Sequence, residues 1–151
     1  MIAKLGAGRE LEEEAVTRGE AETEAVGESL GRRLRSDDVV YLTGDLGSGK
    51  TSFARGLARG AGARPREVAS PTFAICHEYS SDGGSIVLRH LDLYRLKDSL
   101  EDLEVLGLPG AAAGAAVAVE WPRSAIRMLL PPTVEVSFEV LPDGRRRIRT
   151  R

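Results

Sequence analysis

The sequence predicts an α/β fold: a three-layer sandwich in which a mixed, mostly parallel central sheet lies between helices and the chain ends in a β-hairpin. Two short apolar runs, residues 39–43 and 115–119, are typical of strands buried on both faces of a parallel sheet. Segments with apolar residues at helical spacing alternate with these runs. Near the C-terminus, the alternating stretch 134–140, a Pro-Asp-Gly turn and the polar stretch 145–150 indicate the hairpin.

The first third of the chain divides into an extension, a helix and a strand. Residues 1–19 are polar, and we expect an extension that is disordered or that begins a helix at 10–14. Residues 20–151 are expected to form a single domain, which starts with a helix at 20–34 whose apolar residues fall near helical spacing. The strand at 39–43 follows this helix.

The middle of the chain continues the alternation. A helix at 52–60 is expected to end at a Gly-Ala-Gly sequence and Pro65. Segments 74–79 and 86–91 flank a Ser-Asp-Gly-Gly turn and are predicted to pair as a hairpin. Leucines at helical spacing then predict a helix over 98–106.

Composition limits the function classes. The 151 residues are 42% hydrophobic, contain no apolar stretch long enough to span a bilayer, and do not begin like a signal peptide. The single Cys76 can form no internal disulfide, so we expect a packing residue and a cytoplasmic protein. A net charge of −2 argues against a bulk nucleic-acid binder. Five arginines cluster between 145 and 151; we interpret them as a solvated strand face, with a phosphate or RNA contact left open.

Residues 44–51 read Gly-Asp-Leu-Gly-Ser-Gly-Lys-Thr, a complete phosphate-binding loop between a predicted strand and a predicted helix. Its backbone N–H groups and the following helix N-terminus are expected to bind the phosphates of ATP. Lys50 is expected to reach the β- and γ-phosphates, and the Thr51 hydroxyl to ligate Mg²⁺. The expected nucleotide-binding residues are Gly44, Asp45, Leu46, Gly47, Ser48, Gly49, Lys50, Thr51 and Ser52. The fold is therefore expected to be like that of P-loop NTPases.

Two acids follow apolar strands downstream of the loop. Asp92 ends Ile-Val-Leu-Arg-His-Leu-Asp, and Glu120 ends Ala-Val-Ala-Val-Glu. Acids in this position lie at the ligand-binding edge of an open α/β sheet, so both are candidates to position Mg²⁺. Thr72, after Pro71, could contact the γ-phosphate or Mg²⁺ as switch segments do. His77 and His90 have no metal-ligand spacing around them, and we interpret both as structural.

Together these segments resemble the TsaE (YjeE) family, small ATPases required for threonylcarbamoyladenosine formation on tRNA. The resemblance covers nearly all of the chain from Glu20 to Arg145. It is carried by a Glu-x-x-Thr-x-x-x-Gly helix start, the phosphate loop, Ser-Pro-Thr-Phe, His-Leu-Asp-Leu-Tyr-Arg and Glu-Trp-Pro, which stand at 20–27, 44–51, 70–73, 90–95 and 120–122. Two residues depart from the family pattern, Arg123 after Glu-Trp-Pro and Leu91 after His90, and neither is expected to affect the phosphate chemistry.

The resemblance implies roles for individual residues. Lys50, Asp92, Glu120 and Thr72 match the catalytic set, and Thr51, Asp92 and Glu120 match the groups that hold Mg²⁺. Trp121 is expected to be a gate or a partner contact near the nucleotide. Glu20, Thr23, Gly144 and Arg145 match the region around the nucleoside.

The implied activity is weak ATP hydrolysis that acts on the TsaD and TsaB proteins, which modify the adenosine beside the anticodon of ANN-decoding tRNAs. A contact with tRNA would then be indirect, and no membrane is involved. Two alternatives remain open from the residues: a small-molecule kinase and a nucleotide-binding adaptor whose hydrolysis is incidental. The kinase needs an acceptor pocket and a lid for which the chain is short. No arginine finger can be identified in the sequence.

Overall fold

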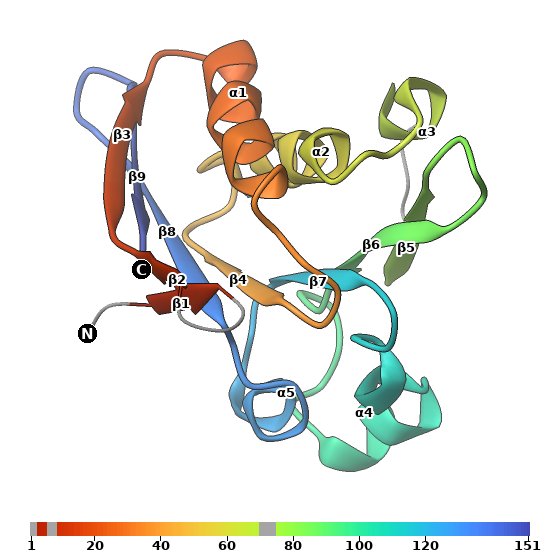
Figure 1. The fold of residues 1–151 in the computed structure, drawn as a ribbon. Helices are drawn as coiled ribbons and strands as arrows, with labels where there is room; N and C mark the ends of the chain where they lie inside the picture. Colours follow the sequence, from red (N-terminus) through yellow and green to blue (C-terminus); the bar gives the residue numbers. More distant parts are fainter. Residues whose placement is uncertain (1–2, 6–8, 70–74) are drawn as a thin grey trace.

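The computed structural model describes residues 3–5, 9–69 and 75–151, and it has three layers. One layer contains helices α1 (Glu20–Gly31) and α2 (Lys50–Gly60), and the opposite layer contains α4 (Leu100–Val105) and α5 (Ser124–Leu129). The central sheet lies between them, and the short α3 (Pro65–Ala69) lies beside the β5–β6 hairpin (Figure 1). A single 3₁₀ turn at Leu108–Gly110 follows α4.

The central sheet has seven strands in the order β3-β9-β8-β4-β7-β6-β5. Their bounds are β3 Glu13–Thr17, β4 Val39–Thr43, β5 Cys76–Ser80, β6 Ile86–Asp92, β7 Ala116–Glu120, β8 Val134–Val140 and β9 Arg146–Thr150. The four central strands β8, β4, β7 and β6 are parallel, while the strands on either side of them pair antiparallel. The predicted three-layer α/β fold, with its mixed sheet and C-terminal hairpin β8–β9, is confirmed.

Two apolar cores lie on the two faces of the sheet. The side chains of β4 alternate between them: Val40 and Leu42 pack with Phe53 and Leu57 of α2, whereas Tyr41 and its neighbour Val39 pack against α4 and α5. This alternation explains why the parallel strands read as continuous apolar runs, since both of their faces are covered. Among the described residues, no helix is long and apolar enough to cross a membrane.

Helices α1 and α2 approach each other closely because glycines line their contact. A Cβ added at Gly27 would lie 2.3 Å from the Phe53 carbonyl oxygen, and one at Gly56 would lie 2.1 Å from the Glu24 carbonyl oxygen. Gly31 and Gly60 repeat this contact one turn further along each helix. The start of α2, which carries Lys50, is therefore fixed directly against the backbone of α1.

The N-terminal extension contains strands, so the prediction of a helix start at Glu10–Glu14 is wrong. Strands β1 (Ala3–Leu5) and β2 (Arg9–Leu11) form a separate two-stranded antiparallel sheet, and β3 forms one edge of the central sheet by pairing with β9. Charge complementarity accompanies this pairing: Arg149 Nε is 3.0 Å from Glu14 Oε2. A division of the chain at residues 19 and 20 stays a prediction.

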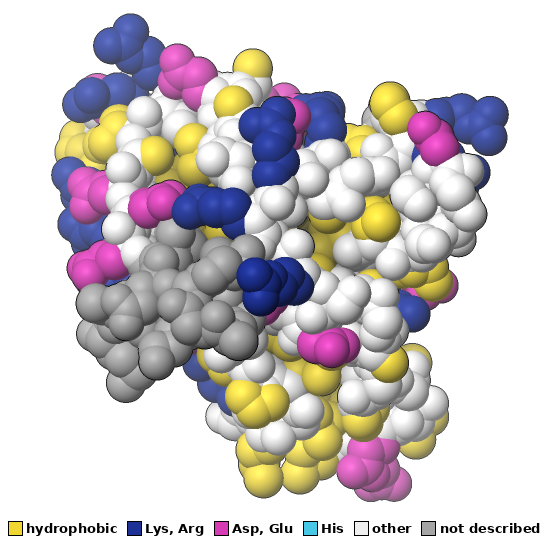
Figure 2. Space-filling view, in the orientation of Figure 1, with side chains coloured by type: hydrophobic (Ala, Val, Ile, Leu, Met, Phe, Trp, Pro, Cys, Tyr) yellow, Lys and Arg dark blue, Asp and Glu magenta, His cyan; other side chains and the backbone are white. Residues whose placement is uncertain are grey.

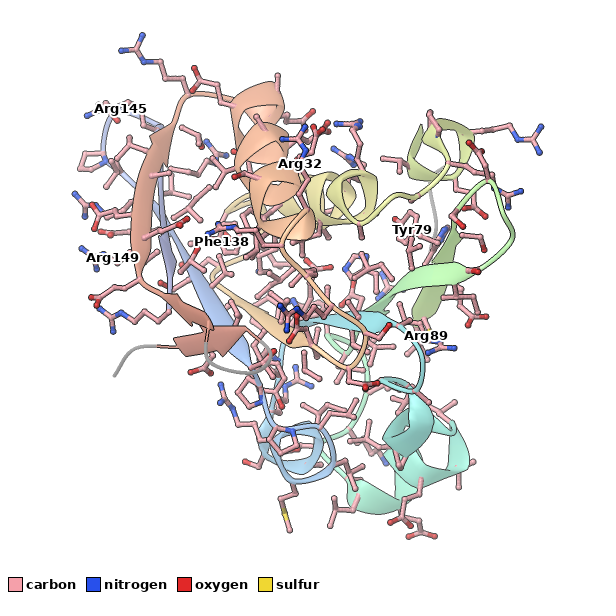
Figure 3. The ribbon with its side chains drawn as sticks, viewed as in Figure 1. Arg32, Tyr79, Arg89, Phe138, Arg145 and Arg149 are labelled. Atoms are coloured by element: carbon pink, nitrogen blue, oxygen red, sulfur yellow. The ribbon has the colours of Figure 1, made fainter. Side chains whose placement is uncertain are left out.

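Acidic side chains of β3 and arginines of β9 lie on the same part of the sheet, where Figure 2 shows acidic and basic side chains mixed together. Arg147 pairs with Glu139 of β8 at 2.9 Å as well as with Glu14. Arg145 and Arg149 lie along the outer side of the sheet (Figure 3). Arg147 and Arg149 therefore make ion pairs with the strands beside them, which agrees with the interpretation as a solvated strand face for these two arginines.

Two short helices were not predicted from the sequence. Pro65, expected only to end the preceding helix, is the first residue of α3, a position where its missing N–H costs nothing. The six-residue α5 has too few turns to show a clear apolar period.

Candidate functional site

The candidate site forms at the carboxyl ends of the parallel strands. Thr43 ends β4 and leads into the phosphate loop, while Asp92 and Glu120 end β6 and β7. The strand register places Asp92 beside Glu120, and Glu120 beside Leu42 of β4. Both acids therefore lie next to the loop, as expected for the ligand edge of such a sheet.

The loop between β4 and α2 depends on glycines at two positions. Gly44 has φ +156°, and a Cβ there would lie 2.7 Å from Ser48 Oγ and 2.8 Å from the Phe138 carbonyl oxygen. Gly49 has φ +108° and immediately precedes α2. The first turn of α2 contains no acidic residue, so its N–H groups and positive dipole end are left to attract an anion.

A cavity of about 340 Å³ opens in front of this loop. Its volume falls at the lower end of the range of about 300–1,000 Å³ that is typical of small-molecule sites. Its lining residues are Gly19, Glu20, Thr23, Leu46, Gly47, Gly49, Lys50, Thr51, Ser52, Asp92, Tyr94, Glu120, Trp121 and Arg146.

Lys50 is buried and binds its own loop. Its Nζ donates hydrogen bonds to the carbonyl oxygens of Gly44 and Asp45, the latter at 2.9 Å. Burial lowers the pKa of Lys50, and the carboxylates of Glu120, Asp45 and Asp92 offset part of that effect. The Lys50 ammonium therefore lies at the loop as a partly desolvated positive charge, which suits an anionic ligand in the cavity.

An aromatic ring covers Lys50, and a second ring packs against the first. The Trp121 ring centroid is 4.2 Å from Lys50 Nζ, within cation–π distance, and the Tyr94 ring packs against Trp121 with 4.9 Å between centroids. Trp121 has φ +59°, an uncommon conformation for a bulky side chain, and it directly follows Glu120. The turn after β7 therefore aims the indole at the phosphate loop.

Glu120 is buried and joins the loop to β6. Its Oε1 accepts a hydrogen bond from Thr51 Oγ1 at 3.4 Å, and its Oε2 lies 2.8 Å from His90 Nε2. Asp92 is exposed, and its Oδ1 accepts a hydrogen bond from the Tyr94 N–H at 3.1 Å. Glu120 is thus held on two sides, whereas Asp92 faces the opening of the cavity.

These oxygens fit a hard divalent cation. A hydroxyl and two carboxylates are the ligand types that Mg²⁺ prefers, and Mg²⁺ in such sites also takes waters and substrate phosphates. In the part of the chain that the structure describes, no group of three or more His, Cys, Asp or Glu could hold a metal ion unaided. Thr51, Asp92 and Glu120 thus offer oxygen ligands to a cation whose remaining positions are filled by water or phosphate oxygens.

The structure brings most of the expected site residues together. Eleven of the lining residues were expected: Glu20, Thr23, Leu46, Gly47, Gly49, Lys50, Thr51, Ser52, Asp92, Glu120 and Trp121. Gly44, Asp45 and Ser48 form the back of the loop and do not line the cavity. Gly144 and Arg145 do not line it either, since Arg145 turns away to pair with Asp143 at 2.6 Å. Thr72 lies outside the described residues.

Three lining residues were missed by the sequence reasoning, Gly19, Tyr94 and Arg146. Arg146 donates a hydrogen bond to the Gly47 carbonyl at 3.0 Å, across 99 positions of sequence. Tyr94 lies two residues after Asp92 in the His-Leu-Asp-Leu-Tyr-Arg segment, so its position in the sequence could have indicated that it lies at the site. Arg146 belongs to the arginine cluster for which a phosphate contact was left open, but only the fold shows that the β8–β9 turn lies beside the loop.

Comparison with known proteins gives consistent results. The family model described as "Threonylcarbamoyl adenosine biosynthesis protein TsaE" matches residues 17–148. The "tRNA threonylcarbamoyladenosine biosynthesis protein TsaE" of Treponema pallidum is 40% identical over 134 residues, covering 88% of this chain and 96% of that protein. The protein of the same name from Rickettsia felis is 36% identical over 131 residues, covering 87% and 75%. The crystal structure of Bacillus subtilis YdiB superposes with a TM-score of 0.72 and 27% identity, covering 99% and 86%.

Proposed function

The chain belongs to the TsaE family, and we propose that it is a weak, Mg²⁺-dependent ATPase that supports threonylcarbamoyladenosine modification of tRNA. It binds ATP at the phosphate loop and acts on the TsaD–TsaB complex in the cytoplasm. Contact with the ANN-decoding tRNAs is through that complex.

The convergence of Lys50, Thr51, Asp92 and Glu120 on one cavity is the observation that carries this proposal. Phosphoryl transfer to water needs positioning and charge neutralisation more than covalent chemistry, and these residues supply both. Lys50 and the loop N–H groups bind the phosphates. Thr51, Asp92 and Glu120 would hold Mg²⁺, which neutralises phosphate charge when it is bound.

Glu120 suits a second task, the orientation of the attacking water. Its carboxylate is buried at the end of β7 and has one oxygen toward Thr51 of the loop. A carboxylate held in this way can accept a proton or a hydrogen bond from a water beside the γ-phosphate. We therefore assign Glu120 to hydrolysis more than to nucleotide affinity.

We expect slow hydrolysis by the chain alone, because in the described part of the chain the basic side chains that line the cavity do not provide a free arginine for the transition state. Among the described residues that line it, Lys50 and Arg146 are basic, and Arg146 is engaged with the carbonyls of Gly144 and Gly47. An arginine that stabilises the transition state raises hydrolysis by about 10³–10⁵-fold in other NTPases. We expect the partner complex to provide such a stimulus.

The test compares phosphate release by the native chain and by Glu120→Gln, with and without TsaD–TsaB. Glu120→Gln is expected to bind ATP normally and to lose hydrolysis by about 100-fold or more, because the amide cannot act as a base. Lys50→Ala is expected to lose ATP binding, and Lys97→Ala, on an exposed loop residue, serves as the control.

Two outcomes would contradict the proposal. Phosphorylation of an added metabolite without the partner complex would favour a small-molecule kinase. If Glu120→Gln released phosphate at the native rate, Glu120 would have no role in hydrolysis. That result would favour a nucleotide-binding adaptor whose hydrolysis is incidental.

A further inference from the structure

We infer that His90 is a positioning residue that holds the Glu120 carboxylate in its working orientation. This inference rests on the proposed ATPase function and extends it to a residue that the sequence reasoning assigned only to structure. The observation behind it is a buried pair, with His90 Nε2 at 2.8 Å from Glu120 Oε2 and side chains 8% and 6% exposed.

The strand register brings the two residues together. On β6, His90 and Asp92 point to one face of the sheet, and on β7 the matching positions are Ala118 and Glu120. His90 is paired with Ala118 in the register, so the imidazole reaches diagonally past a small side chain to Glu120. Position 118 contributes only a methyl group, so it cannot restrain the carboxylate.

A buried carboxylate needs hydrogen-bond donors to offset its lost hydration. Thr51 Oγ1 is one donor at 3.4 Å, a long contact, and it belongs to a residue that a bound cation would engage. With its proton on Nε2, His90 donates the shorter bond to the other oxygen and leaves Oε1 toward the loop. Fixing one oxygen in this way orients the second toward the phosphates.

Lys50 gives the carboxylate an alternative partner. The Glu120 charge acts on the Lys50 ammonium inside the same cavity. Without the His90 donor, the Glu120 side chain is free to rotate toward this cation, which removes an oxygen from the place where Mg²⁺ or water is held. His90 therefore acts through Glu120 and does not itself touch the nucleotide.

The second histidine provides a matched control. His77 is the register partner of His90 on the neighbouring strand β5, and its ring packs on Tyr79 with 4.2 Å between centroids. It lies on the side of His90 away from β7, which carries Glu120. A change at His77 disturbs the same part of the sheet without removing the donor to Glu120.

The experiment compares His90→Gln with His90→Met. The two side chains have similar length and volume, but only the glutamine amide donates a hydrogen bond from near the Nε2 position. His90→Met is expected to lower kcat and raise the Mg²⁺ concentration for half-maximal activity by about 10–100-fold, as found when partners of metal ligands are removed. His90→Gln and His77→Gln should keep most of the activity, and ATP affinity without Mg²⁺ should stay unchanged in all three.

A double-mutant comparison tests whether His90 acts through Glu120. Trp121 is the single tryptophan and lies beside Lys50, so its fluorescence reports Mg²⁺–ATP binding without hydrolysis. In a Glu120→Gln background, His90→Met should cause no further change in the Mg²⁺ dependence of this signal. Thermal unfolding of each variant checks the fold; if His90→Met does not fold, His90→Asn, whose amide is too short to reach Glu120, replaces it.

Each result decides the inference. Equal activity of His90→Met and the native chain, or an equal defect in His90→Gln and His90→Met, overturns the positioning role. A native chain that gives no Mg²⁺–ATP signal overturns the proposed function itself, and the inference with it. A native response together with a defect restricted to His90→Met supports both.

Discussion

Single residues set the electrostatics of the cavity. Lys50 is buried under Trp121, bonded to its own loop, and has a lowered pKa because it is desolvated. Such a lysine gains more from a phosphate partner than an exposed one would, because the charge is already removed from water. The aromatic cover therefore prepares the ammonium for an anion that enters the loop.

Tyr41 gives a residue-scale prediction about stability. Its side chain is fully buried, and its hydroxyl donates a hydrogen bond to the Leu130 carbonyl at the end of α5, with the Ile126 carbonyl oxygen 3.3 Å away. Burial raises the pKa of Tyr41 from 10.0 to about 12. Since the unfolded chain loses this proton near pH 10 and the folded chain only near pH 12, the stabilising contribution is complete below pH 10 and is lost as the pH rises to 12.

The free energy of unfolding should therefore fall between pH 10 and pH 12 by about 1–2 kcal/mol less in Tyr41→Phe than in the native chain. At neutral pH the variant should be less stable by about 1 kcal/mol, because it lacks the hydroxyl that bonds to the Leu130 carbonyl. Chemical denaturation at a series of pH values measures both effects, with Tyr94→Phe as the control at an exposed ring. Burial also raises the pKa of Tyr79, so part of the pH dependence should remain in Tyr41→Phe. If the free energy of unfolding fell with pH equally in the native chain and in Tyr41→Phe, the raised pKa of Tyr41 would be contradicted.

At the scale of elements, the contact between α1 and α2 decides where the phosphate loop lies. At each of the four glycines of this contact, a Cβ would lie within 2.4 Å of a backbone oxygen of the other helix. Because α2 begins at Lys50, any shift of the helix moves the lysine and the Thr51 hydroxyl. The geometry of the site thus depends on the packing of glycines up to ten residues away.

Gly56→Ala is expected to destabilise the chain by about 1–3 kcal/mol, as overpacked sites do. The added methyl group would lie 2.1 Å from a backbone oxygen of α1, and neither helix can relieve that contact without moving. Urea unfolding compares this variant with Gly110→Ala, where a Cβ meets nothing within 4 Å. Equal stability of Gly56→Ala and Gly110→Ala would show that the helices can separate at no cost.

Sequence reasoning succeeded where a pattern is local. The apolar runs 39–43 and 115–119 and the loop glycines have local causes, and these features lie where they were expected. Strand β3 depends instead on pairing with β9, across some 130 residues, so its own residues gave no sign of it. The same limit applies to Arg146, which reaches Gly47 through the fold, and to the bond between His90 and Glu120 on adjacent strands.

At the scale of the whole molecule, the cavity collects residues from both ends of the chain. Glu20 and Thr23 begin α1, the phosphate loop begins α2, Trp121 follows β7, and Arg146 begins β9. The proposed nucleotide would therefore contact elements that also reach the outer surface. This arrangement allows the surface offered to a partner to differ between ATP, ADP and the empty site.

Nucleotide-dependent binding to TsaD–TsaB is the most direct measurement of the central claim, that the ATPase site acts on this partner. A pull-down with ATP, with ADP and without nucleotide should show retention that differs among the three states. In Lys50→Ala, which is expected not to bind ATP, retention should match that without nucleotide in every case. Equal retention by the native chain in all three states, or no retention in any of them, would contradict the account.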